Sequence, residues 1–433
     1  MSALYYLLGV VLFVVAILAS IALHELGHMI PAKKFGGKVT QYFVGFGNTV
    51  WSRKVGETEY GIKSIPLGGY VKIVGMLPPD KEGNLRESNT GMFTQLIADA
   101  RAAEAEHVEE GDEDRLFYKM AWWKKVIVMA AGPSVNIAIA FVIFGALFAT
   151  YGNIGDPVTE PKVAEVQRCA VPYSQSERAC TASDPDTPAY AAGLRTGDVV
   201  TSFNGTQVED WATLQSLIRA NADNTAVLTV QRDGAEKTLT TRTIVSARPT
   251  SATDEKLTDV GFLGMLPTVR PETGGLVYTV DQMGTMTVST VQALGHMPVK
   301  VWGVAKAIAG QQERDPEGPM SVVGGGRIAG ETAATQAFPV KEKAVLLLML
   351  IGGFNFFIGM FNFVPLLPLD GGHIAGALYE ALRRGWARIR RRPDPGYVDV
   401  AKLLPVAYVV AGAFLLMSVV LIVGDIVKPI HIA

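Results

Sequence analysis

Charged residues are scarce in this chain of 433 residues. They make up 18% of it, against about 25% in an ordinary soluble domain, whereas hydrophobic residues make up 49%. The formal net charge is only −2, so the chain lacks the basic domain or stripe that nucleic-acid binding requires, and we expect no nucleic-acid partner. The length allows two or three domains. This composition predicts a membrane protein that carries a soluble part.

Long apolar runs, by contrast, are abundant. A helix needs about 20 residues to cross a hydrocarbon core of ~30 Å, and four runs reach that length: Leu4–Leu23, Val126–Tyr151, Ala344–Leu367 and Leu403–Val423. A cleaved signal peptide is the alternative for the first run, but a positive n-region is absent and Lys33 and Lys34 follow the apolar residues. The sequence therefore predicts a polytopic α-helical membrane protein with four transmembrane helices.

Basic residues near the ends of the runs indicate the orientation. Lysines follow the first run and precede the second, and the basic stretch "RRGWARIRRR" (383–392) lies between the third and the fourth. Short loops rich in Lys and Arg stay in the cytoplasm, so both termini and the long segment between runs two and three should be extracytoplasmic. The predicted divisions are 1–37 (first span), 38–125 (cytoplasmic β-loop and amphipathic region), 126–151 (second span), 152–342 (extracytoplasmic region), 343–370 (third span), 371–402 (basic loop) and 403–433 (fourth span and outer tail).

The first cytoplasmic loop has two parts. Residues 38–73 alternate β-branched and aromatic residues with polar ones and are broken by glycines, which predicts short hairpin strands. Residues 93–118 are rich in Ala and Glu and read as helical, and we expect the acidic "EEGDED" (109–114) to be a solvated patch without a function.

The outer segment contains a compact module. It reads as a strand at Val199–Phe203, a turn at Asn204-Gly205, an amphipathic helix at 211–221 and a hairpin at 226–241. This order resembles bacterial PDZ domains over about 163–245, with their A-G-L-x-x-G-D core at Ala192–Leu194 and Gly197-Asp198. The alternative is an unrelated small α+β domain. A PDZ fold would offer a strand edge and a groove for an extended peptide.

Three other features of the outer segment carry weaker expectations. Cys169 and Cys180 are the only cysteines, and no histidine lies near them to make a zinc site. An oxidising compartment allows a disulfide, whereas two free thiols are the alternative, since sequence does not define their geometry. Residues 285–310 look amphipathic, and the glycine-rich 318–330 reads as an entry to the third span that lacks the Lys-Ser/Thr of a P-loop.

Three ionisable residues close the first apolar run, in "HELGH". His24 and His28 are four residues apart, so on a helix they share one side and can bind one Zn²⁺, with Glu25 beside them as general base. Ionisable residues at membrane depth cost about 2.5–3.5 kcal/mol even on the lenient insertion scale. The alternative is that the three residues only mark the membrane interface.

A catalytic zinc site takes three protein ligands, so a third should lie elsewhere. Asp370 follows the third apolar run, and runs one and three end on the same side of the membrane because each crossing reverses the direction. Asp425, His296 and His431 fall on the opposite side. His373 is an alternative, but a carboxylate more commonly completes a two-histidine site, so we expect His373 to cap or pack locally.

Together these residues resemble the site-2 proteases, which are intramembrane zinc metalloproteases. The likeness is closest to the bacterial regulator-of-sigma type, and within it to actinobacterial members with a single PDZ domain. It extends over nearly the whole chain and includes several further motifs: Gly45-Phe46-Gly47 in a membrane-associated β-loop, "PLGGYV" (66–71), Gly132-Pro133-x-x-Asn136 and Gly318-Pro319. Many members have proline at the position of Leu367, whereas here the proline is Pro368, which puts in doubt only the local shape beside the cleft.

The resemblance implies a role for single positions. His24, His28 and Asp370 would bind one Zn²⁺, Glu25 would be the catalytic acid and base, and Asn362 would hydrogen-bond the substrate backbone. A polar contact between helices is the alternative for Asn362. Gly45, Phe46 and Gly47 would contribute to substrate binding from the β-loop.

The same resemblance implies a location and a substrate. The protein would lie in the bacterial plasma membrane, with its active site near the cytoplasmic side. It would cut single-span membrane proteins such as anti-sigma factors after a first extracytoplasmic cut, with the PDZ domain as a gate on substrate size. A membrane-anchored PDZ scaffold or a zinc transporter is the alternative.

Overall fold

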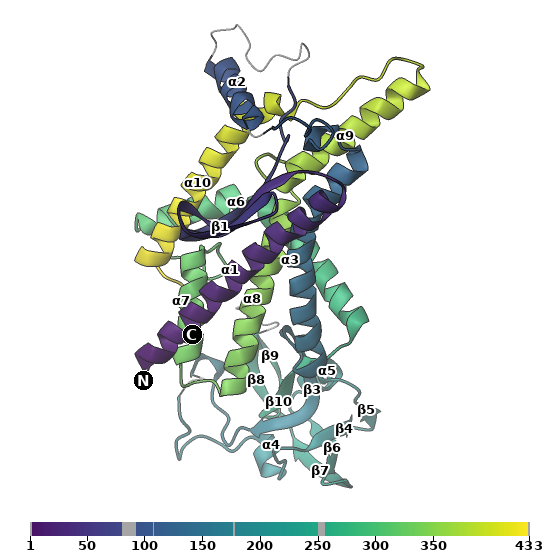
Figure 1. Ribbon diagram of the computed structural model, residues 1–433. Helices are drawn as coiled ribbons and strands as arrows, with labels where there is room; N and C mark the ends of the chain where they lie inside the picture. Colours follow the sequence, from purple (N-terminus) through teal and green to yellow (C-terminus); the bar gives the residue numbers. More distant parts are fainter. Residues whose placement is uncertain (1, 80–91, 107, 176–177, 250–255, 432–433) are drawn as a thin grey trace. The chain divides into compact units, whose positions relative to one another are not determined.

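The structure is a computed structural model that describes residues 2–79, 92–106, 108–175, 178–249 and 256–431. It divides into two compact units, one formed by Met1–Leu147 with Gly275–Ala433 and the other by Phe148–Gly274. Within the described residues, four helices are long and apolar enough to cross a membrane: α1 (Ser2–Lys34), α3 (Trp122–Thr150), α8 (Val340–Asn362) and α10 (Leu404–Val427) (Figure 1). The prediction of four apolar helices is confirmed.

One of the predicted boundaries is wrong in a way that matters for the site. Helix α1 continues past Leu23 and through Pro31 to Lys34, within the predicted first span at 1–37, so "HELGH" lies inside the helix. Helix α8, in contrast, ends at Asn362 rather than at Leu367. Pro365 and Pro368 lack backbone N–H donors and interrupt helical hydrogen bonding after Asn362, and Asp370 opens a separate helix, α9 (Asp370–Ile389).

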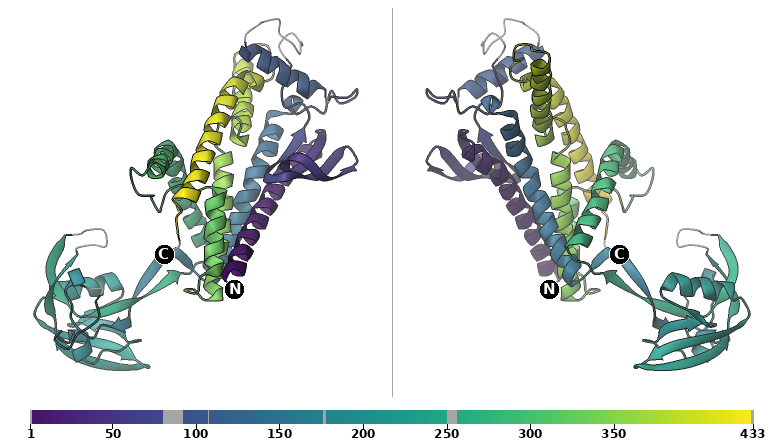
Figure 2. Two further views of the ribbon diagram at one scale, coloured as in Figure 1. Left: turned by 90° about the vertical axis from the view of Figure 1, so that its left-hand side faces the viewer. Right: turned by 90° about the vertical axis from the view of Figure 1, so that its right-hand side faces the viewer.

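Residues 39–73 form one long hairpin rather than several short strands. Strands β1 (Val39–Val55) and β2 (Thr58–Ile73) pair antiparallel, with shifts in register along their length. Gly45 and Gly47 have positive φ angles of 93° and 85°, a conformation that residues with a Cβ rarely adopt. The hairpin lies beside α1 (Figure 2), and the Tyr42 hydroxyl donates to the Ala22 carbonyl of that helix at 2.7 Å.

The acidic stretch 109–114 is exposed as expected except for Asp112. It follows α2 (Met92–Ala105) and precedes the short η1 (Phe117–Lys119). Asp112 is buried, and one of its carboxylate oxygens lies 2.5 Å from Nζ of the equally buried Lys38 at the base of the hairpin. Glu109 pairs with the same ammonium at 2.7 Å. The stretch therefore anchors the hairpin.

The residues before the third span also form more helix than predicted. The amphipathic stretch belongs to α6 (Leu276–Ile308), and the glycine-rich stretch is the helix α7 (Val322–Ala334), which packs along α1. A Cβ on Gly9 of α1 would lie 2.3 Å from the Ala329 carbonyl oxygen of α7. Small residues at such a crossing let two helix backbones approach closely.

The second unit is built on a β-sheet. The strands β3 to β10 span Asn153–Val166, Val199–Phe203, Thr206–Gln207, Thr225–Arg232, Ala235–Arg242, Ile244–Pro249, Leu257–Phe262 and Met265–Glu272. Their order in the sheet is β10-β3-β4-β6-β7, with β5 beside β4, while β8 and β9 pair separately. The helices are α4 (Pro188–Ala191) and α5 (Trp211–Ala220).

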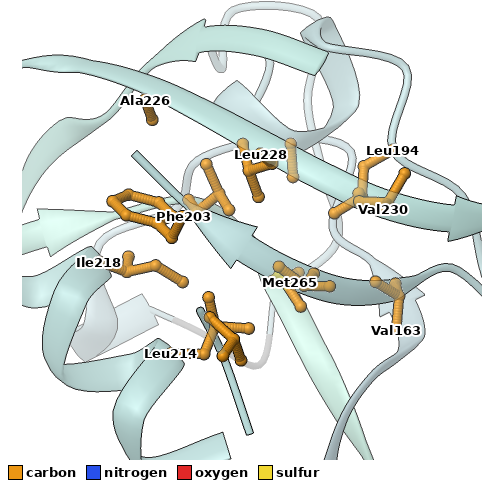
Figure 3. Packing of buried hydrophobic residues seen from close by; sticks show 13 residues of the cluster. Val163, Leu194, Phe203, Leu214, Ile218, Ala226, Leu228, Val230 and Met265 are labelled. Carbon is orange, nitrogen blue, oxygen red and sulfur yellow. The ribbon is translucent and has the colours of Figure 1, made fainter. Parts of the chain in front are cut away.

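The core of this unit lies between the sheet and α5. Phe203, Leu214, Leu228 and Val230 are among its fully buried side chains (Figure 3). The strand, helix and hairpin predicted at 199–241 are therefore present. Cys169 and Cys180 form a disulfide, rather than two free thiols.

Candidate metal centre

Helices α1 and α9 bring three donor atoms together. His24 and His28 stand one turn apart on α1, and Asp370 is the first residue of α9. The two Nε2 atoms are 3.2 Å apart, and each lies 3.3 Å from the same Asp370 oxygen, Oδ2. Within the described residues, these three form a group that can hold a metal ion.

These separations fit zinc. Ligand bonds of 2.0–2.1 Å in a tetrahedral site place neighbouring ligand atoms roughly 3.3–3.4 Å apart, which matches the three separations found. Two imidazoles and a carboxylate are also an established ligand set for catalytic Zn²⁺ and leave a fourth position open. The residues present therefore fit the metal.

The other ring nitrogen of each histidine is held by an oxygen. His24 Nδ1 lies 2.6 Å from Oδ1 of Asn136, and His28 Nδ1 lies 2.8 Å from the Val128 carbonyl. A carbonyl-type oxygen accepts, so the hydrogen-bond network assigns the proton to Nδ1 in both rings. Each Nε2 then has a free lone pair directed at the metal position, as is usual for ligating histidines.

Asn136 is itself held by a residue that the sequence analysis missed. Its Nδ2 donates to Oδ1 of Asn355 on α8 at 3.0 Å, and Asn355 Nδ2 donates to the Ile351 carbonyl at 2.9 Å. Both asparagines are buried. Asn355 could have been recognised from the sequence as a polar side chain inside an apolar span, because polar residues at such positions usually have a structural or functional role.

Glycines allow the elements of the site to approach one another. A Cβ on Gly132 of α3 would lie 2.2 Å from His28 Nε2, so α3 can pass the ligand only because this residue has no side chain. At the start of α9, a Cβ on Gly371 would lie 2.2 Å from the Val364 carbonyl oxygen. The "DGG" sequence thus lets α9 begin tightly against the loop that follows α8.

The three donor atoms open into a pocket of about 410 Å³. Glu25 lines it, and the Val71 backbone of β2 hydrogen-bonds its carboxylate. A Cβ on Gly69 would lie 3.2 Å from Glu25 Cγ, so the hairpin passes close above the glutamate. Asn362 and His373 also line the pocket, but His373 is outside the three-residue group.

Strand β2, rather than the β1 strand that carries Gly45, Phe46 and Gly47, borders the pocket. The hairpin residues that line the pocket are on β2 and include Gly68, Gly69 and Tyr70, whereas Gly45, Phe46 and Gly47 of β1 are not among the lining residues. Phe46 instead stacks on the Tyr70 ring, with centroids 6.3 Å apart. Phe46 therefore packs against Tyr70 of β2.

The three more distant candidates have other partners. Asp425 pairs with Arg314 at 2.9 Å. His296 Nδ1 lies 2.8 Å from the Gln292 carbonyl, and His431 Nδ1 lies 2.9 Å from Glu331. None of them belongs to the group of three ligands.

Fold and site together indicate a class of protein: a membrane metallohydrolase, with two histidines and an aspartate that could hold a metal ion and a glutamate in the same pocket. Comparison with known proteins makes this specific. Residues 12–393 match the sequence model of Peptidase family M50, and the chain belongs to that family.

Named relatives agree over most of the chain or all of it. Zinc metalloprotease Rip1 of Mycobacterium tuberculosis is 34% identical over 439 residues, which cover 99% of both chains. Metalloprotease MmpA of Caulobacter vibrioides is 27% identical over 86% of both chains. Regulator of sigma-W protease RasP of Bacillus subtilis is 24% identical over 86% of this chain and 90% of its own. The protein is thus a zinc metalloendopeptidase of the membrane.

Proposed function

We propose that this protease cuts single-span membrane proteins inside the membrane, with His24, His28 and Asp370 as zinc ligands and Glu25 as general base and acid. The observation that carries the proposal is the set of three donor atoms at 3.2–3.3 Å on helices that belong to the membrane unit. Zinc, when bound, would supply an activated water and polarise the peptide carbonyl. The ligands' Nδ1 hydrogen bonds support their orientation toward it.

We assign the proton transfers of the reaction to Glu25. Its carboxylate lines the same pocket as the ligands, so it can take a proton from the attacking water and return it to the leaving amine. Asn362, the last residue of α8, lines the pocket as well. Its side-chain amide is the group we assign to the backbone of the substrate beside the cut bond.

An extended substrate would have a strand to pair with. A transmembrane helix hides its peptide bonds in its own hydrogen bonds, so a cut requires that it unwinds locally. Strand β2 borders the pocket with Gly68, Gly69 and Tyr70, and strand addition to such an edge is a common way to hold a peptide.

Within the sheet unit we assign residues of about 163–245 as a PDZ domain outside the cytoplasm, and we assign the basic stretch 383–392 as cytoplasmic. The strand order and the position of α5 support the first assignment, and the positive-inside rule supports the second. The name of the relative RasP refers to sigma-W, and for the present chain we propose anti-sigma factors as a substrate class, cut after an earlier outer cut. A variant without residues 163–245 should cleave untrimmed substrate; if it still ignores it, the PDZ domain is not a gate.

Glu25→Gln separates metal binding from chemistry. It should keep one zinc ion per chain and lose cleavage of a reporter transmembrane substrate, whereas unchanged cleavage would contradict the role of Glu25. Asp370→Ala should lose zinc. Undiminished zinc and activity in that variant would transfer the third ligand position to His373 or another residue.

A further inference from the structure

A second and larger cavity lies on the other side of the loop that carries Asp370. It is a groove of about 1370 Å³ lined by the loop after α8, one face of α9, the segment 395–403 and the first turn of α10. Its apolar walls include Pro365, Leu366, Leu367, Leu403 and Val406. Leu403 and Val406 are 47% and 54% exposed. The zinc chemistry does not use this groove.

Cations border the groove. Lys119 and Lys402 both line it, and in the part of the chain that the structure describes neither has a carboxylate at ion-pair distance, although the exposed Glu113 interacts with Lys119 from farther away. Arg383 also lines it, and its Nη2 donates to the carbonyls of Pro395 and Gly396, which leaves its charge unneutralised.

Among the described residues that line the groove, the only acidic side chain is already neutralised. Asp399 lies 2.6 Å from the buried Arg101 of α2. The described lining residues therefore contribute a net positive charge, although most of the wall is apolar.

The position of these cations corresponds to the depth of lipid headgroups. Lys119 stands just before α3 begins at Trp122, and Lys402 just before α10 begins at Leu404. Tyr118, Tyr379 and Tyr397 line the same groove. Aromatic and basic residues at the ends of spans mark the membrane–water interface. The leucines that line the groove would then lie at the depth of the acyl chains.

We propose that this groove binds an anionic phospholipid, with its phosphate between Lys119 and Lys402 and its acyl chains along Leu403 and Val406. Basic pockets between transmembrane helices on the cytoplasmic side are suited to such lipids. An apolar peptide would account for the leucines but not for two lysines that have no carboxylate at ion-pair distance among the described residues. Charge complementarity thus selects the lipid as occupant.

The bound lipid would support the metal site from behind. Leu366 and Leu367 of the groove wall belong to the loop that leads into Asp370, and Gly372 of the wall follows it. A groove filled by acyl chains restrains this loop. The protease should therefore hold its third ligand better in anionic than in neutral bilayers.

The test uses the full chain, purified in detergent and returned to nanodiscs of phosphatidylcholine with or without phosphatidylglycerol. Native mass spectrometry should find phosphatidylglycerol retained in preference to phosphatidylcholine of the same chain length. Each lysine near an anionic headgroup contributes about a fivefold preference, so the Lys119→Gln, Lys402→Gln double variant should lose roughly thirtyfold. Equal retention of the two lipids by the wild-type protein would overturn the proposal.

A control with the same charge change sharpens the result. Arg388 and Arg391 are exposed residues of the basic loop that do not line the groove, so the Arg388→Gln, Arg391→Gln variant should retain the lipid. A loss as large as that of the lysine variant would show a general effect of charge and contradict the assigned site.

A third variant keeps all the charges and fills the groove. Val406→Trp should reduce retention of phosphatidylglycerol, because the indole occupies the space of an acyl chain at a position that is already exposed. If the lysine variant does not fold, this variant and titration of the wild-type protein with short-chain phosphatidylglycerol and phosphatidylcholine still decide the question. Saturation by a detergent-solubilised apolar peptide with equal affinity would assign the groove to a protein partner instead.

Discussion

Asn136 Nδ2 donates a hydrogen bond to Asn355 Oδ1 at 3.0 Å, and this contact joins α3 to α8 next to His24, the proposed metal ligand. It determines which way the Asn136 amide faces. With its NH₂ group engaged by Asn355, Asn136 presents an oxygen to His24 Nδ1 and thereby keeps the lone pair of the ring on Nε2. The orientation of a proposed metal ligand on one span is thus held by residues on two others.

Replacing Asn355 should therefore weaken zinc binding. In Asn355→Leu the Asn136 amide loses its partner and can rotate, which presents N–H to a ring nitrogen that must itself donate. Loss of such outer partners typically costs 10–100-fold in metal affinity, and we expect a decrease of about that size in a competition titration with a chelator. Ser20→Ala is the control, since it removes a buried polar group from α1 whose hydroxyl donates to the Ala16 carbonyl of the same helix. If a folded Asn355→Leu protein binds zinc as tightly as the wild-type protein, Asn355 does not orient the proposed ligand His24.

A single added methyl group on α3 should abolish zinc binding at the same site through a steric clash. A Cβ on Gly132 would lie 2.2 Å from His28 Nε2, so Gly132→Ala must displace the imidazole or α3. We expect loss of bound zinc, measured by elemental analysis of the purified protein. Gly145→Ala on the same helix is the matched control, because its Cβ would meet nothing closer than 3.8 Å. If Gly132→Ala keeps its zinc, α3 does not pass as close to His28 as described.

Much of this site could be predicted from the chain because its signals are local or topological. Spacing placed His24 and His28 on one side of a helix, and the parity of the spans directed attention to Asp370. The interhelical contacts had no such signal. Asn136 was noticed only as part of a motif, and Asn355 was passed over, because a hydrogen bond between two helices depends on their packing and not on sequence distance.

The errors in the fold have a similar origin. The acidic stretch is solvated as expected except at Asp112, whose burial was missed because only the tertiary fold brings Lys38 to it. The extent of α8 was overestimated because hydropathy continues to Leu367, whereas the prolines end the helix at Asn362. Local hydropathy reports burial in lipid and does not report backbone geometry.

In the sheet unit, Asp198 should be the most sensitive acidic residue. It is 1% exposed and receives hydrogen bonds from Arg232 Nε and Nη2, both at 2.7 Å, and from the Arg195 amide at 2.8 Å. Burial would raise the pKa of Asp198, but these donors more than offset it and lower that pKa. Removing one partner of a buried ion pair costs about 3–5 kcal/mol.

Asp198→Asn should therefore lower the protection of β4 and β6 amides against hydrogen exchange by about a hundredfold or more, which corresponds to that cost. The control is Asp223→Asn. The pair of Asp223 with Arg242 is exposed on both sides, and such pairs contribute little to stability. Similar changes in the two variants would show that burial does not determine how much the Asp198–Arg232 ion pair contributes to stability.

The ion pair between Lys38 and Asp112 should make the stability at the base of the hairpin depend on pH. The hydrogen bond from Lys38 lowers the pKa of Asp112. Burial alone would lower the pKa of Lys38, but its bonds to Asp112 and Glu109 more than offset this and raise it. The carboxylate therefore contributes stability above its unfolded pKa of about 3.9 that is lost as pH falls through its lower folded value. The ammonium contributes stability below about 10.4 that is lost as pH rises through its higher folded value.

The anchoring of the hairpin should thus be constant from about pH 5 to pH 9 and weaken outside that range. Hydrogen exchange of the Val74 amide, which donates to the Lys38 carbonyl at 2.9 Å, reports on it directly once intrinsic exchange rates are corrected for pH. Asp112→Asn should lower protection at this amide across the whole range, because it leaves Lys38 buried with only the exposed Glu109 as partner. Asp114→Asn changes the same charge at an exposed neighbour and should leave it unaltered. Equal protection in the two variants would show that the hairpin is held by its backbone pairing and by α1 rather than by this ion pair.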